Sequence, residues 1–178
     1  LMETGVITAV AMNGAGVIHD VELALIGETS EDVAANLPEG AFGMVEETAT
    51  FVNSALASAT AEKANPGYGT LVGRKLLAER PPHLDVSILA AGVRLGIPVT
   101  VHVAVGTDIV HMHPSADGAA IGRATFADFQ KFTSIVSELE GGVYLNVGSA
   151  VVLPEVFLKA LTVARNLGHT VEHFTTAN

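Results

Sequence analysis

The chain has 178 residues, 49% of them hydrophobic, and its 19 acidic against 9 basic side chains give a net charge of −10 near neutral pH. This acidic balance argues against nucleic-acid binding, which requires cations opposite the phosphates, and it is compatible with a cationic ligand. Because the chain has no cysteine, disulfides, thiolate metal sites and cysteine nucleophiles are excluded.

Length and the two ends of the chain predict one domain in the cytoplasm. The 178 residues suffice for a single domain, and no apolar run reaches the roughly 18 residues of a membrane-spanning helix. The first residues show no signal peptide, so we expect a cytoplasmic protein without a membrane partner. Residues 1–5 have the pattern of a final helical turn, and residues 170–178 that of a strand with no successor. We therefore expect residues 1–178 to be a single α/β domain and an incomplete stretch of a longer chain.

Strand-like and helix-like segments alternate along the chain. A β-type apolar run at 5–12 is followed by helix-like periodicity at 17–26 and 43–63. Helices are then predicted at 70–79 and 84–95, and Gly96 closes the second of them. A strand at 97–105 and a loop at 106–122 follow, and a capping box of Thr125 and Asp128 opens a helix at 125–139. The last predicted elements are a strand at 141–148, a helix from Pro154 to Gly168 and a strand at 169–174. This order predicts an α/β fold in which helices flank a parallel sheet on both faces.

Ionisable side chains gather in the loop that follows a very apolar strand. The stretch AVGTDIVHMHPSADGAAIG, residues 104–122, carries Asp108, His111, His113 and Asp117. Ligands of parallel sheets bind beyond the carboxyl ends of the strands, which is where this loop is expected to lie. Such a pocket is acidic or amphoteric and suits an amine or another polar ligand. The alternative is a solvated loop whose histidines are incidental.

The side-chain chemistry of this loop suggests roles. His111 is predicted to be a general acid or base, because imidazole titrates near neutral pH. Asp108 is predicted to orient His111 or to pair with a cationic substrate, which makes these two the expected catalytic pair. His19, His113 and Asp117 are predicted to bind the substrate.

Two turns rich in small residues are candidate cofactor sites. NGAG at 13–16 supplies Gly14 and Gly16 before a helix, and NVGSA at 146–150 supplies Gly148 and Ser149. Backbone amides at such turns can face a phosphate. The full G-x-G-x-x-G fingerprint is absent, however, and a tight turn needs no ligand. Ser149 could donate to a phosphate, but taken alone it is better suited to cap the helix that follows.

A metal site is a further reading of the same loop. On an extended segment His111 and His113 share a face, so both could ligate a metal with an aspartate. The spacing fits no strong zinc signature, and His102 lies inside a predicted strand. We assign no metal, and a metal-dependent hydrolase stays an alternative.

Three patches, in this order, resemble the deoxyhypusine synthase family, which uses NAD to move an aminobutyl group from spermidine onto a protein lysine. AMNGAGVIHDVELAL resembles its strand and A-G-G-V-E-E-D turn, and SILAAGVRLGIPVTVHVAVGTDIVHM its helix, I-P-V strand and T-D-G-S-L-G-D-M loop. VGSAVVLPEVFLKAL resembles its G-G-G-V-V-K-H-H turn. The resemblance implies a Rossmann-like fold of NAD-binding type, NAD at the two turns, an amine or polyamine substrate and a homotetramer.

The chain departs from that family at chemically important positions. His19 stands in place of a glutamate, His111 in place of the aspartate that receives the amine, and Pro154 in place of a histidine. The family's nucleophilic lysine lies in a W-G-K segment beyond the last strand, whereas this chain has no tryptophan. The leading reading is a deoxyhypusine-synthase-like, NAD-dependent transferase acting on an amine. The alternative is a non-catalytic dinucleotide- or small-ligand-binding protein on the same scaffold.

Overall fold

Two short pairs of parallel strands are surrounded by helices in the computed structural model, which describes residues 1–58 and 65–178. β1 (Val10–Asn13) pairs with β2 (Val99–His102), and β3 (Val143–Leu145) pairs with β4 (Thr175–Ala177), both in parallel. The helices are α1 (Gly14–Ile26), α2 (Val33–Asn36), α3 (Glu46–Ala57), α4 (Tyr68–Glu79), α5 (Ile88–Leu95), α6 (Gly118–Val136) and α7 (Val152–Asn166), with 3-10 helices η2 (Leu84–Val86) and η3 (Ile109–His111). None of these described helices is both long and apolar enough to cross a membrane.

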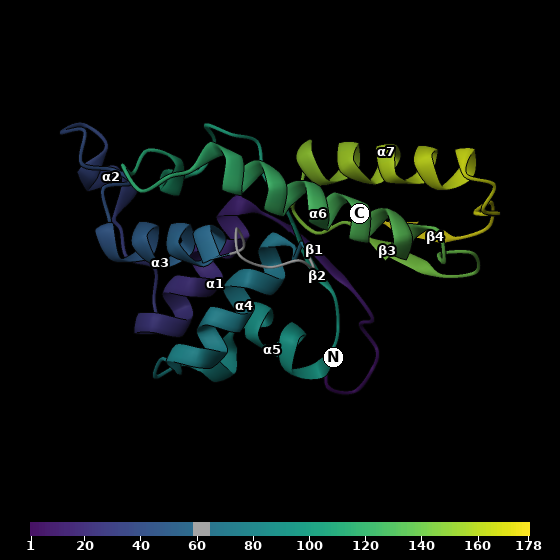
Figure 1. Ribbon diagram of the computed structural model, residues 1–178, viewed down its shortest axis with the longest axis horizontal. Coiled ribbons are helices and arrows are strands. Elements are labelled where there is room, and N and C mark those ends of the chain that lie inside the picture. The colour runs from purple at the N-terminus through teal and green to yellow at the C-terminus, as the bar shows by residue number, and fades with distance from the viewer. Residues whose placement is uncertain (59–64) are drawn as a thin grey trace.

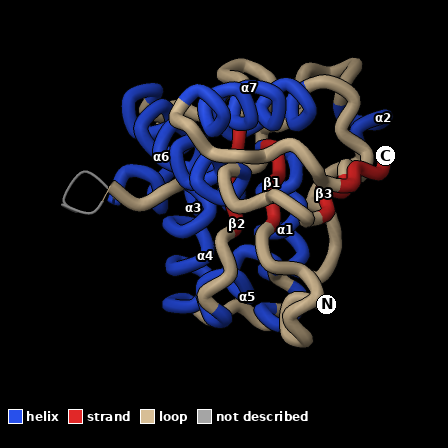
Figure 2. The backbone as a smooth tube through the Cα atoms, turned by 90° about the vertical axis from the view of Figure 1, so that its right-hand side faces the viewer, coloured by secondary structure: helices blue, strands red, loops and turns tan. Residues whose placement is uncertain are grey.

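Helices lie on both sides of the β1–β2 pair. α6 and α7 run along one side, while α1, α4 and α5 pack on the other (Figure 1). Figure 2 shows β1 and β2 side by side between these two groups of helices. The predicted α/β class with parallel strands and flanking helices is therefore confirmed, whereas the prediction of one sheet is wrong, because the described strands form two separate two-stranded sheets.

Two hydrophobic clusters hold these layers together. One joins α1, α3, α4 and α5 to β2 and includes the fully buried Val17, Val52, Leu76 and Val101. The other lies between α6, α7 and the β3–β4 pair, where the Tyr144 ring stacks on Phe157 with their centroids 4.0 Å apart.

The outer edge of β2 is closed by side chains of α6. The Val101 amide donates to Asp128 Oδ2 over 2.8 Å, and the Val103 amide donates to Thr125 Oγ1 over 3.2 Å. The predicted capping box of Thr125 and Asp128 is therefore wrong, because both side chains bond a strand. Helix α6 begins seven residues earlier, at Gly118, where the Asp117 carboxylate accepts the amides of the first turn.

Other boundaries move because side chains capture backbone amides. The strand predicted at 169–174 is displaced to β4, and Glu140 Oε2 instead accepts the amides of Glu172 and His173. The helix predicted from residue 43 starts at Glu46, since the Gly43 amide donates to the Glu31 carboxylate. The predicted end of that helix lies outside the described residues. The helix predicted at 84–95 is divided into η2 and α5.

The start of α5 depends on a buried carboxylate from α1. Asp20 accepts the Ser87 hydroxyl at 2.6 Å, the Ile88 amide at 2.6 Å and the Leu89 amide at 3.3 Å. We expect Asp20→Ala to lower the free energy of unfolding by about 2 kcal/mol, because these buried donors lose their acceptor. Urea unfolding measures this. Asp85→Ala, which removes an exposed carboxylate in η2, should change stability little, and equal effects of the two substitutions would contradict the capping role.

Candidate functional site

The candidate site lies where β1 and β2 end. β1 leads directly into α1 at Gly14, and β2 leads into segment 103–108 and η3. Gly14 is buried against Asp108, so closely that a Cβ atom at Gly14 would lie 1.9 Å from Asp108 Oδ2. The glycine therefore provides the space that the carboxylate occupies over the first residue of α1.

The ring of His111 is oriented so that Nε2 faces Asp108 and Nδ1 faces the backbone. Its Nδ1 accepts the amides of Gly106 at 3.2 Å and of Asp108 at 3.4 Å. A nitrogen that accepts hydrogen bonds carries no proton, so the neutral ring holds its proton on Nε2. Nε2 lies 3.8 Å from Asp108 Oδ2, too far for a hydrogen bond. Both atoms are shielded from solvent, and neither has a hydrogen-bond partner among residues 1–58 and 65–178.

Burial changes the pKa values of Asp108 and of the nearby Tyr68. The loss of solvent raises the pKa of Asp108, and this outweighs the opposite effects of His111 and Thr107. Tyr68, at the start of α4, also lies near the carboxylate. Burial, with a smaller contribution from the Asp108 charge, raises the pKa of Tyr68. The site thus holds a carboxyl group that is easier to protonate than an exposed one.

Asn53 of α3, which was not predicted from the sequence, contacts η3 and the turn that follows it. Its Nδ2 donates to the Val110 carbonyl and to Ser115 Oγ, both at 3.0 Å. Its Oδ1 is buried and has no hydrogen-bond partner in the part of the chain that the structure describes. A sequence signal did exist, because Asn53 shares one helix face with Ala49, Val52 and Leu56, where a polar residue is unusual.

The other predicted substrate residues do not join this pair. His19 is exposed on α1, and the Asp117 carboxylate is used as the cap of α6. His113 Nδ1 lies 2.7 Å from Ser115 Oγ in its own turn. Burial lowers the pKa of His102 to about 4, and its Nε2 lies 3.0 Å from Thr100 Oγ1. In residues 1–58 and 65–178, no three histidine, aspartate or glutamate side chains form a group that could hold a metal.

In the two glycine-containing turns, 13–16 and 146–150, polar side chains cap the helices that follow. The Gly16 amide donates to Asn13 Oδ1 at 2.9 Å, so Asn13 caps α1. Ser149 Oγ accepts the Leu153 amide at 3.1 Å at the start of α7, and Gly148 has a positive φ with open space around it. At the start of α1, the Asp108 carboxylate lies where a pyrophosphate would need to approach Gly14. The residues there do not fit that anionic group.

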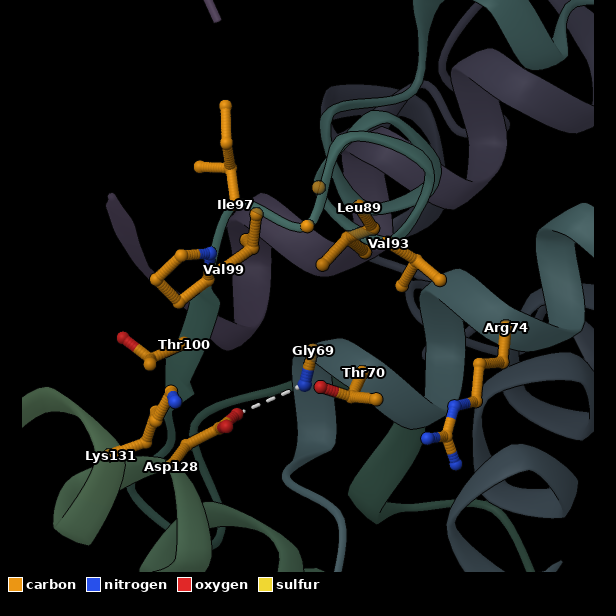
Figure 3. Close-up of a pocket in the computed structure, with 13 residues that line it drawn as sticks. Gly69, Thr70, Arg74, Leu89, Val93, Ile97, Val99, Thr100, Asp128 and Lys131 are labelled. Carbon is orange, nitrogen blue, oxygen red and sulfur yellow. Dashed lines mark hydrogen bonds between the residues drawn. The ribbon is translucent and has the colours of Figure 1, made fainter. Parts of the chain in front are cut away.

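A cavity of about 300 Å³ lies beside the opposite, amino end of β2. Arg74 and Lys131 lie on opposite sides of it (Figure 3), so these two cations do not converge on one ligand group. Asp128 points toward α4, where its Oδ2 accepts the Gly69 amide at 2.9 Å. The polar groups at this end therefore join structural elements.

Comparisons with protein-family models, with curated proteins and with solved structures find no match for this chain. Function is therefore inferred from the geometry of Asp108 and His111.

Proposed function

We propose that this chain binds a small amine at Asp108 and His111, the substrate class that the resemblance to deoxyhypusine synthase implies. The supporting observation is that Asp108 Oδ2 and His111 Nε2 lie 3.8 Å apart, buried and without hydrogen-bond partners among the described residues. Leaving a buried polar atom unpartnered costs roughly 1–3 kcal/mol. One ligand atom that bonds to both removes two such costs at once.

The distance between the two protein atoms suits a single nitrogen. Hydrogen bonds between such atoms are about 2.8–3.0 Å long, so one nitrogen beside the pair can reach both. Its N–H group donates to Asp108, and the carboxylate oxygen strengthens this bond when it is ionised. Residues 104–107, which lead into Asp108, are exposed.

The resemblance also implies NAD, a Rossmann-like arrangement and a homotetramer, all of which stay predictions. Because the carboxylate beside Gly14 does not fit a pyrophosphate, no step of this proposal passes through NAD. Amine binding is common to a transferase and to a non-catalytic binding protein on this scaffold, and the geometry supports the binding itself.

Replacing Asp108 with asparagine should weaken the binding of n-butylamine by roughly 10- to 100-fold, because a charge-assisted hydrogen bond is lost from a buried site. Isothermal titration calorimetry with the whole chain at neutral pH measures this effect. The shape of the side chain is retained, so a thermal unfolding curve close to that of the unaltered chain is expected.

Asp117→Asn is the matched control, since it removes a carboxylate that caps α6. It should leave the affinity for n-butylamine unchanged. Absence of saturable binding by the unaltered chain would refute the proposal, as would equal affinities of the chain and of Asp108→Asn.

A further inference from the structure

We infer that the Asp108–His111 site takes an amine in its uncharged form and that His111 selects this form. The inference rests on the proposed function, because it requires an amine at this site. Nothing in the resemblance supplies it, since the family has an aspartate where this chain has His111. It follows from the orientation of one ring.

His111 presents only a hydrogen-bond donor to the ligand. Its Nδ1 accepts the Gly106 and Asp108 amides at 3.2 and 3.4 Å, which places the proton on Nε2. Moving that proton to Nδ1 would set it against two N–H groups and break both bonds. On the side that faces Asp108, the ring therefore offers the donor Nε2–H and has no acceptor atom of its own.

An alkylammonium ion fits this arrangement poorly. It has N–H groups but no lone pair, so it can donate to Asp108 Oδ2 while directing further N–H groups at Nε2–H of His111. An uncharged amine donates one N–H to Oδ2 and accepts Nε2–H through its lone pair. Since the two protein atoms lie 3.8 Å apart, one nitrogen can make both bonds.

The surrounding groups favour the same form. Burial raises the pKa of both Asp108 and Tyr68, so an alkylammonium ion that enters beside them loses its hydration shell, whereas an uncharged amine loses far less. On binding, an alkylammonium ion releases one proton to solvent and enters as the free base, whose lone pair accepts Nε2–H of His111.

Two amines of equal chain length test this inference. Ethylamine is almost wholly protonated at neutral pH, whereas the fluorines of 2,2,2-trifluoroethylamine lower its basicity and leave it mostly uncharged. Calorimetric titration of the whole chain should show that trifluoroethylamine binds roughly tenfold or more tightly than ethylamine.

Two variants separate charge from the apolar character of the fluorinated group. His111→Asp replaces the donor with an acceptor, so its preference should reverse toward ethylamine. His111→Gln offers an amide N–H in place of Nε2–H, so it should keep the preference for trifluoroethylamine. Thermal unfolding shows whether each variant is folded, and the comparison in the unaltered chain needs neither of them.

The outcomes distinguish the two proposals. Tighter binding of ethylamine by the unaltered chain overturns the inference but leaves amine binding intact. An unchanged preference for trifluoroethylamine in folded His111→Asp also overturns it, because the fluorines alone would then explain the affinity. If neither amine binds to the unaltered chain, the proposed function fails as well.

Discussion

Gly14→Ala should weaken n-butylamine binding by roughly 100-fold, although it removes no group that contacts the ligand. The added methyl group would lie 1.9 Å from Asp108 Oδ2 and 2.3 Å from its Cγ. Real contacts of this kind are at least 3.0 Å, so the carboxylate must retreat by roughly 1 Å. Its position opposite His111 is then lost.

Gly16→Ala provides a close control two residues along the same helix. A Cβ atom at Gly16 would meet its nearest neighbour, Met12 Cβ, at 3.2 Å, which a small adjustment relieves. Alanine is also the better helix former, by about 1 kcal/mol. Calorimetry should therefore show near-normal amine binding by Gly16→Ala.

The same pair of variants tests the earlier interpretation of this turn. If the glycines served close approach of a phosphate, both substitutions would weaken NAD binding and neither would affect the amine. If Gly14 makes room for Asp108, only Gly14→Ala weakens amine binding. Equal n-butylamine affinities of the two variants would contradict the role assigned to Gly14.

Local patterns predicted most elements of the fold. Gly96 closes α5 in the left-handed conformation with a φ of 70°, as expected for a glycine that follows a helix. Pro154 lies in the first turn of α7, where its missing N–H group carries no penalty. These features depend on neighbours within one or two turns, which a sequence displays directly.

The errors come from contacts between distant segments. Thr125 and Asp128 have the spacing of a capping box, but they bond the edge of β2, more than twenty residues away. Nothing in the local pattern distinguishes a carboxylate that caps its own helix from one that bonds another element. Asp117 illustrates the converse. Its place in the loop predicts contact with a substrate, whereas its carboxylate caps α6.

The candidate site was predictable only in part for the same reason. Asp108 and His111 lie three residues apart in a loop, so their proximity could be expected. The contact of Gly14 with Asp108 and the approach of Asn53 and Tyr68 join segments far apart in the chain. Likewise, the preference of His111 for a proton on Nε2 depends on backbone amides, whose directions a sequence does not reveal.

Asp128 should make the stability of the whole protein depend on pH. This carboxyl group is 3% exposed and accepts backbone amides of Tyr68, Gly69 and Val101. Burial nevertheless outweighs these bonds and raises the pKa of Asp128 from 3.8 to about 7. Because the folded state holds the proton more tightly than the unfolded chain, stability is greatest below pH 4 and falls as the pH rises to 7. Between pH 5 and 8 the loss amounts to roughly 2–3 kcal/mol.

Asp128→Asn isolates this contribution from those of other carboxyl groups. Asparagine resembles the protonated acid in shape and charge but does not titrate, so the variant should lack this part of the pH dependence. Urea unfolding at several values between pH 5 and 8 should show the unaltered chain losing stability relative to Asp128→Asn as the pH rises. A difference that stays constant across this range would mean that the three amides keep Asp128 ionised. In that case the carboxylate joins α4, α6 and β2 equally well at every pH, and burial does not dominate its titration.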